Sequence, residues 1–121
     1  MTEDGSFLMQ GWEMMRKFMS QASIAARIKI MAWGFIAGPR AEDAHRAVFR
    51  YDEKARLPLV KSPTLLIYGT FDTFYHHREA TQGMIPRSKI KVIEGAGPLI
   101  ALEQPKAFAQ AIVEFLKNPV V

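Results

Sequence analysis

The sequence has no cysteine among its 121 residues. A disulfide framework, a cysteine-based metal site and a cysteine nucleophile are therefore excluded. Its apolar runs are all shorter than the roughly 20 residues that a membrane-spanning helix needs. The first four residues, Met-Thr-Glu-Asp, lack the basic start and apolar core of a signal peptide. From these features we expect no membrane partner and a cytoplasmic location.

A clustered basic surface is also missing, although the formal net charge is +4. The 16 lysines and arginines are scattered, and no stretch combines a basic cluster with interleaved aromatic side chains. Proteins that bind nucleic acids usually carry such a cluster. The scattered charges indicate ordinary solvated faces, and we expect no nucleic-acid partner.

What the chain does contain is the composition of a globular domain, with 49% apolar and 23% charged residues. We predict one compact domain overall, made of a helical segment over residues 1–51 and an α/β segment over residues 52–121.

Apolar residues at helical spacing predict three helices in residues 1–51, at about 6–19, 21–37 and 40–51. Five of the seven methionines and both tryptophans lie in the first two of these helices. Methionine and aromatic side chains fill cores, but they also line adaptable binding surfaces. Core packing is one interpretation; a lid over a pocket for a small apolar ligand, or an interface with another chain, is the other.

The segment after these helices predicts two strands that alternate with helices. Residues 52–62 are interpreted as a short extended connector. Thr64–Tyr68 is apolar on both alternating faces, which is typical of a strand covered on both sides of its sheet. The elements expected after it are a helix at 76–84, a strand at Lys89–Ile93, a short turn or helical piece at 99–104 and a final helix from Pro105. Strand and helix alternating at this spacing predict a right-handed unit with two parallel strands.

Three short motifs in residues 56–116 resemble the C-terminal part of the α/β-hydrolase fold. They are Pro-Thr-Leu-Leu-Ile-Tyr-Gly-Thr-Phe-Asp at 63–72, Lys-Val-Ile-Glu-Gly-Ala-Gly-Pro at 91–98 and Leu-Glu-Gln-Pro at 102–105. The similarity is greatest to the branch of epoxide hydrolases, haloalkane dehalogenases and hydrolases of ester or carbon–carbon bonds. The resemblance implies a partial α/β-hydrolase fold, in which the three N-terminal helices match the end of the cap.

The resemblance implies a role for one residue, Asp72, which falls at the position of the triad carboxylate. That carboxylate orients a histidine and stabilises its protonated form. The histidine normally follows the second glycine of the 91–98 motif, but here that residue is Pro98. The nucleophile normally lies in a Gly-x-Ser-x-Gly elbow, and no such motif occurs in these 121 residues. One member of the catalytic apparatus is therefore present.

The three histidines of the chain offer two further interpretations. His76 or His77 could contact Asp72 and replace the missing base, or Asp72 could cap the following helix with both histidines solvated. A metal site from these three residues is disfavoured, because adjacent helical residues point about 100° apart. His45 lies mid-helix beside charged residues and is expected to be exposed. We expect neither a metal nor another cofactor.

Two functions from different classes remain open. In one, the chain is a catalytically silent module that self-associates or binds a ligand; in the other, it is a hydrolase to which a partner chain supplies the nucleophile and the histidine. Because Thr64–Tyr68 can pair within the chain on one side alone, its other edge invites a second chain. We predict a homodimer formed through that edge or by exchange of the N-terminal helices.

Overall fold

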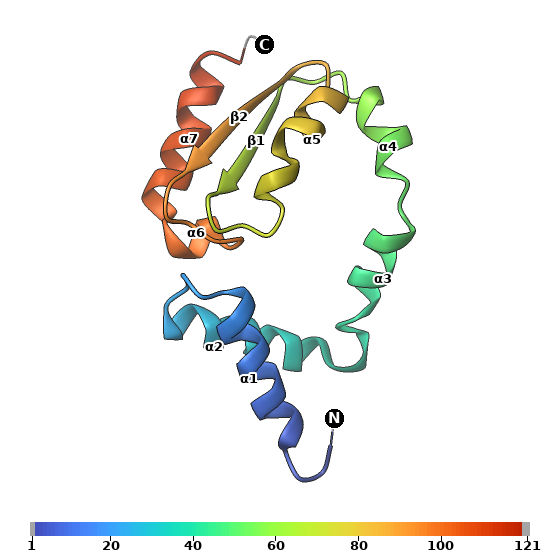
Figure 1. The fold of residues 1–121 in the computed structure, drawn as a ribbon, viewed down its shortest axis with the longest axis vertical. Helices are drawn as coiled ribbons and strands as arrows, with labels where there is room; N and C mark the ends of the chain where they lie inside the picture. Colours follow the sequence, from blue (N-terminus) through green and yellow to red (C-terminus); the bar gives the residue numbers. More distant parts are fainter. Residues whose placement is uncertain (1, 120–121) are drawn as a thin grey trace. The chain divides into compact units, whose positions relative to one another are not determined.

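The computed structural model describes residues 2–119 (Figure 1). The chain divides into two compact units, Met1–Tyr51 and Asp52–Val121, and each is described by itself. Within the described residues, no helix is long and apolar enough to cross a membrane. The cap-like role of residues 1–51, within one compact domain overall, stays a prediction.

The first unit consists of helices joined by short turns. They are α1 (Ser6–Phe18), α2 (Ile24–Ala37), the 3-10 turn η1 (Gly38–Arg40) and α3 (Asp43–Arg50). The Ser23 hydroxyl caps α2 by accepting a hydrogen bond from the Ala26 N–H at 3.2 Å. Arg27 fixes the turn between α1 and α2, because its guanidinium donates to the carbonyls of Met19 at 3.0 Å and Ser20 at 2.9 Å.

The start of α1 follows from a local hydrogen bond rather than from a side-chain cap. Gly5 is the N-cap residue and has a φ of 73°, a conformation that glycine adopts without strain. The Ser6 N–H donates to Asp4 Oδ1 at 3.0 Å. This hydrogen bond, helped by the Thr2 and Ser6 hydroxyls, lowers the pKa of the exposed Asp4 carboxyl.

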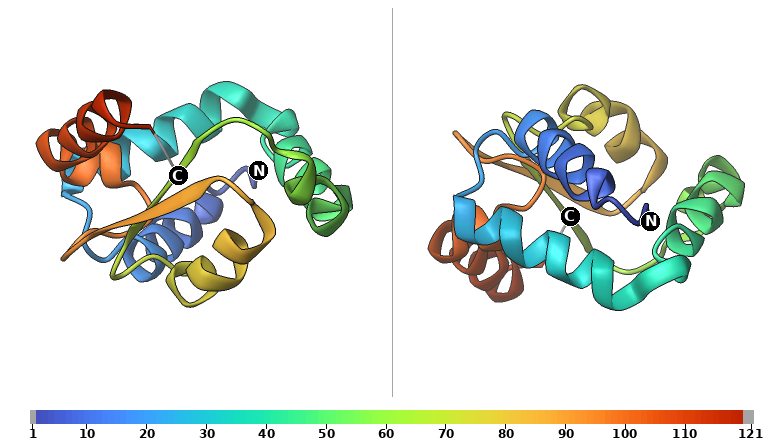
Figure 2. Two further views of the ribbon diagram at one scale, coloured as in Figure 1. Left: turned by 90° about the horizontal axis from the view of Figure 1, so that it is seen from above. Right: turned by 90° about the horizontal axis from the view of Figure 1, so that it is seen from below.

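The second unit is a small α/β layer. Its elements are α4 (Glu53–Arg56), η2 (Leu57–Leu59), β1 (Thr64–Gly69), η3 (Tyr75–His77), α5 (Arg78–Met84), β2 (Ser88–Ile93), α6 (Ile100–Glu103) and α7 (Pro105–Lys117). The two strands are parallel, with Thr64 opposite Ser88 and Gly69 opposite Ile93. Helices α5 and α7 cover opposite faces of the strands (Figure 2). The predicted α/β class with two parallel strands and flanking helices is confirmed.

The core of this unit lies where β2 meets the last two helices. Ile93, Ala96 and Ile100 are buried, and partly buried apolar residues pack against them: Ile67, Ala107 and Phe108. All five residues of the predicted strand Thr64–Tyr68 are only half-buried. The strand therefore has less cover within this chain than its apolar pattern predicts.

The prediction of an extended connector at residues 52–62 is wrong, because this segment forms α4 and η2. Asp52 caps α4, since its Oδ1 accepts a hydrogen bond from the Ala55 N–H at 3.1 Å. Pro58 lies in the first turn of η2, where the missing N–H has no partner to lose. The helix predicted at 76–84 begins as an α-helix at Arg78 and is preceded by the 3-10 turn η3.

The outer edge of β1 is unpaired. The N–H groups of Thr64 and Thr70 donate to carbonyls that flank or end β2, at 2.8 and 3.3 Å. Because parallel pairing alternates along a strand, the even-numbered residues of β1 face β2 and the odd-numbered ones face away. The N–H groups of Leu65, Ile67 and Gly69 have no hydrogen-bond partner within residues 2–119.

Candidate functional site

The loops that follow β1 and β2 are joined at the carboxyl ends of the two strands. The Phe71 N–H donates to the Ala96 carbonyl at 2.9 Å, and the Gly95 N–H donates to the Thr70 hydroxyl at 2.9 Å. Open α/β sheets place their binding and catalytic groups at this end. The structure thus brings the loop that contains Asp72 against the loop that contains Pro98.

This junction depends on glycine at position 69. A β-carbon there would lie 2.2 Å from the Ala96 carbonyl oxygen and 2.7 Å from that of Gly97. Real β-carbons do not approach backbone atoms so closely. The last residue of β1 must therefore lack a side chain if the 94–98 loop is to close over it.

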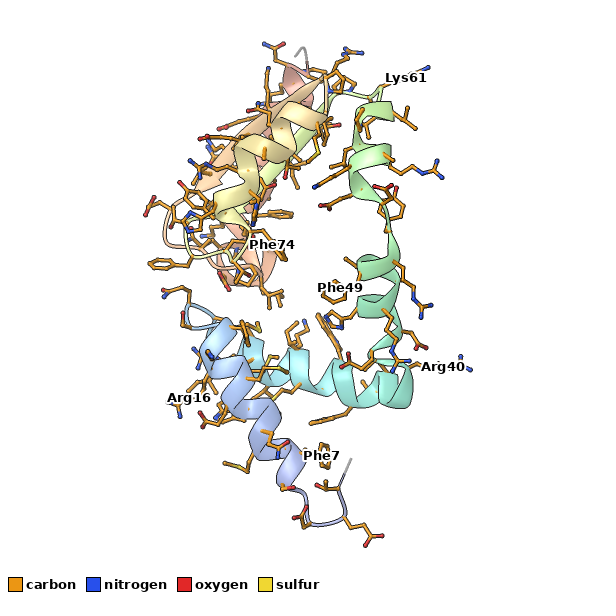
Figure 3. The ribbon with its side chains drawn as sticks, turned by 45° about the vertical axis from the view of Figure 1, so that its right-hand side comes forward. Phe7, Arg16, Arg40, Phe49, Lys61 and Phe74 are labelled. Atoms are coloured by element: carbon orange, nitrogen blue, oxygen red, sulfur yellow. The ribbon has the colours of Figure 1, made fainter. Side chains whose placement is uncertain are left out.

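Asp72 lies half-buried at the start of its loop and is held by its own backbone. Its N–H donates to the Gly69 carbonyl at 3.0 Å, and its Oδ1 accepts a hydrogen bond from the Phe74 N–H at 2.8 Å. This arrangement is an Asx turn that leads into η3. Figure 3 labels Phe74, whose side chain lies on this loop and is 66% exposed. One oxygen of the Asp72 carboxylate thus stabilises the local turn by accepting this hydrogen bond.

The histidines that follow Asp72 are exposed and make other contacts. His76 lies edge-on to the Tyr75 ring with 5.9 Å between the ring centroids. His77 continues the turn through its N–H, which donates to the Phe74 carbonyl at 2.9 Å. No hydrogen bond of residues 2–119 joins either imidazole to Asp72. His45 lies on α3 with its Nδ1 3.9 Å from Glu42 Oε2, and it is exposed as expected.

Glu103 of α6 stabilises the 94–98 loop through a hydrogen bond. Gly97 donates its N–H to Glu103 Oε2, and Gln104 Nε2 donates to the Glu94 carbonyl at 2.9 Å. The second carboxylate oxygen of Glu103, Oε1, is buried without a hydrogen-bond partner in the described part of the chain. Pro98, the last residue of this loop, is exposed.

The contribution of Glu103 was not found from the sequence. Position 103 belongs to the Leu-Glu-Gln-Pro motif, but a glutamate six residues after a glycine has no recognised pattern. Its partner is a backbone N–H, which every residue except proline carries. The motif indicated a short helical piece and could not indicate which group its carboxylate binds.

The described residues contain no group of three or more histidine, aspartate or glutamate side chains that could hold a metal ion. Two shallow hollows, of about 310 and 250 Å³, lie along β2 and α7. Neither of them is lined by Asp72 or Pro98.

No protein-family model matches the sequence. Three curated proteins are similar to part of it. The polyketide synthase ThaQ of Burkholderia thailandensis is 37% identical over 79 residues, which are 64% of this chain and 4% of that protein. The carboxylesterase YbfK of Bacillus subtilis is 30% identical over 63 residues, 50% of this chain and 21% of that protein. A second Bacillus subtilis protein, named for 2-succinyl-6-hydroxy-2,4-cyclohexadiene-1-carboxylate synthase, is 32% identical over 65 residues.

One solved structure is also similar, that of a thermophilic esterase from Thermogutta terrifontis. It aligns with a TM-score of 0.54 and 38% identity, over 60% of this chain and 27% of the esterase. The chain thus spans about a quarter or less of each of these proteins.

Proposed function

The chain is a relative of the α/β-hydrolase-fold proteins and has part of their fold, and from this relationship we propose that it is a hydrolase-like module without hydrolytic activity of its own. Its proposed role is to associate with a second copy of itself or to bind a small apolar ligand. A cytoplasmic location belongs to the same proposal and rests on the sequence.

The observation that carries this proposal is proline at position 98. Two hydrogen bonds join the loop after β2 to the loop after β1, yet the exposed last residue of the 94–98 loop has no group that can take or deliver a proton. Asp72 occupies the family's carboxylate position, but the group it would orient is absent. Removing the base or the nucleophile of a triad leaves only a small part of its rate enhancement.

A second candidate function is a hydrolase of ester, epoxide or carbon–carbon bonds that a partner chain completes. The names of the esterase relatives favour it, as does the half-buried position of Asp72. The partner would supply the nucleophile and the histidine, and Asp72 would be the catalytic acid of this chain.

Intact-mass measurement of the pure chain after incubation with a fluorophosphonate tests whether the chain carries an activated serine of its own. The reagent phosphonylates an activated serine and leaves ordinary serines unmodified. We expect no adduct on the pure chain. A single adduct that Asp72→Asn abolishes would overturn the proposed silence and favour an active hydrolase.

Self-association is proposed to use the free edge of β1. Leu65, Ile67 and Gly69 present unpaired N–H groups there, and an unpaired apolar edge is a template for another strand. A two-fold dimer would pair β1 with β1 of the second copy and extend the sheet. Exchange of the N-terminal helices is the other route to a dimer, and it would leave this edge free.

Two proline variants test the edge directly. Leu65→Pro removes an N–H that faces away from β2, whereas Leu66→Pro removes one that pairs with β2. In sedimentation velocity at micromolar concentration we expect the wild type to be a dimer and Leu65→Pro a folded monomer. Leu66→Pro should lower stability instead. A folded wild-type monomer contradicts self-association, and a dimeric Leu65→Pro variant indicates helix exchange.

A further inference from the structure

The first unit contains a cavity of about 640 Å³ within its own helices. Its walls come from α1, α2, η1, the two residues that lead into α3, and α3 itself. Phe7, which Figure 3 labels on α1, lines it together with Phe35, and their rings meet edge to face at 5.9 Å. All of its lining residues are apolar except Glu42 and His45.

Three glycines lie in the wall of this cavity: Gly11, Gly34 and Gly38. A β-carbon at Gly34 or Gly38 would meet no atom within 4 Å, and one at Gly11 would meet only the Met31 side chain, at 3.6 Å. Gly34 lies inside α2, where glycine weakens a helix relative to alanine. Gly34 is exposed, so a larger residue would fit at this position and would stabilise the helix.

We propose that this cavity binds a flat, apolar aromatic molecule that carries one hydrogen-bond donor, such as an aryl amine. This inference rests on the ligand-binding part of the proposed function and names the class of ligand. The volume lies within the roughly 300–1,000 Å³ typical of small-molecule sites. Phe7, Trp33 and Phe35 offer ring faces and edges, and methionines adapt to an irregular apolar surface.

The two polar lining residues indicate which kind of polar group the ligand carries. Glu42 carries a carboxylate, which accepts hydrogen bonds and repels a negative group. His45 Nδ1 lies 3.9 Å from Glu42 Oε2, too far for a hydrogen bond. The Glu42 side chain is 71% exposed at the edge of the cavity, where its carboxylate can accept a hydrogen bond from an N–H of the ligand. A donor at the polar end is favoured over an anionic group.

The test is fluorescence titration of the full-length chain with N-phenyl-1-naphthylamine, a neutral aromatic amine with a single N–H. We expect saturable binding with one molecule per chain. Gly34→Leu should fill the cavity and weaken binding by more than about tenfold. Its thermal midpoint should be no lower than that of the wild type, because leucine is the better helix former.

Gly83→Leu is the matched control. Gly83 also lies inside a helix, α5, and a β-carbon there also meets no atom within 4 Å. This variant should bind the naphthylamine as the wild type does. Equal binding by Gly34→Leu, or equal loss in both variants, would mean that the dye binds exposed apolar surface and would overturn the proposal.

The sulfonated analogue 8-anilino-1-naphthalenesulfonate tests the polar end. We expect it to bind at least about tenfold more weakly than the neutral amine, and Glu42→Gln to narrow this difference. Equal affinity for both dyes would overturn the assignment of a donor end. A chain that binds neither dye, yet is dimeric and unreactive toward fluorophosphonate, overturns this inference and leaves the rest of the proposed function in place.

Discussion

Gly69 and Ala96 approach each other so closely that a β-carbon at position 69 would lie 2.2 Å from the Ala96 carbonyl oxygen. This contact joins the end of β1 to the loop after β2, beside the Phe71 N–H that donates to the same carbonyl. The loop positions of Asp72 and Pro98 depend on it. Glycine is required because the atoms nearest to such a β-carbon belong to the backbone of residues 96 and 97. Backbone atoms, unlike a flexible side chain, cannot rotate out of the way.

Gly69→Ala should therefore lower the free energy of unfolding by about 3 kcal/mol, because the β-carbon forces two backbone segments apart. Urea denaturation followed by circular dichroism measures the change. Gly83→Ala is the control, since its β-carbon meets no atom within 4 Å. It should stabilise α5 by about 0.5 kcal/mol. Equal stability of Gly69→Ala and the wild type would contradict the described junction.

Glu103→Ala should cost about 2 kcal/mol, because it leaves the Gly97 N–H without its acceptor in a partly buried position. The same denaturation experiment applies. Glu114→Ala is the matched control. The Glu114 side chain is 53% exposed, and its carboxylate forms an exposed ion pair with Lys91 Nζ at 3.8 Å. Removing that exposed pair should change stability by less than about 0.5 kcal/mol. A similar cost for both variants would argue against the buried role of Glu103.

Ser23→Ala should destabilise the first unit by about 1 kcal/mol, because the Ala26 N–H loses its side-chain acceptor at the start of α2. Ser20→Ala removes a hydroxyl that contacts only the exposed Gln21 amide, at 3.4 Å, and should be neutral. Thermal unfolding of both variants by calorimetry gives the comparison. A neutral Ser23→Ala variant would contradict the cap.

Amide hydrogen exchange should distinguish the two edges of β1 residue by residue. The Leu66 N–H faces β2 and should be protected at every protein concentration. The Ile67 N–H faces away from β2, so its protection should appear only when a second chain covers the edge. Two-dimensional NMR of samples at low and high concentration measures this. Protection of Ile67 in a monomer would mean that the edge is already covered within the chain.

The strands could be predicted from the sequence because their signals are local. Thr64–Tyr68 is apolar on both faces, and Lys89–Ile93 follows after a helix-length segment, so both strands and their parallel order were predicted to within a residue. The sequence pattern placed Asp72 just past the carboxyl end of β1, where the structure also has it. Its catalytic role stays a prediction.

Other features of the structure depend on contacts that no sequence pattern predicts. Helix α4 differs from the expected extended connector because Asp52 caps it and Pro58 fits the first turn of η2. The support that Glu103 gives to Gly97 is a contact to a backbone N–H. The cavity in the first unit is lined by residues of separate helices, so it can be recognised only when the helices are in place.

Ester turnover tests most directly whether this hydrolase-like chain lacks hydrolytic activity of its own. A panel of p-nitrophenyl esters of increasing acyl length should be assayed with the pure wild type and with Asp72→Asn, at equal concentration and with buffer alone. We expect the wild type, the variant and the buffer to release p-nitrophenol at the same rate. Turnover by the wild type that rises with protein concentration and is lost in Asp72→Asn would contradict the claim.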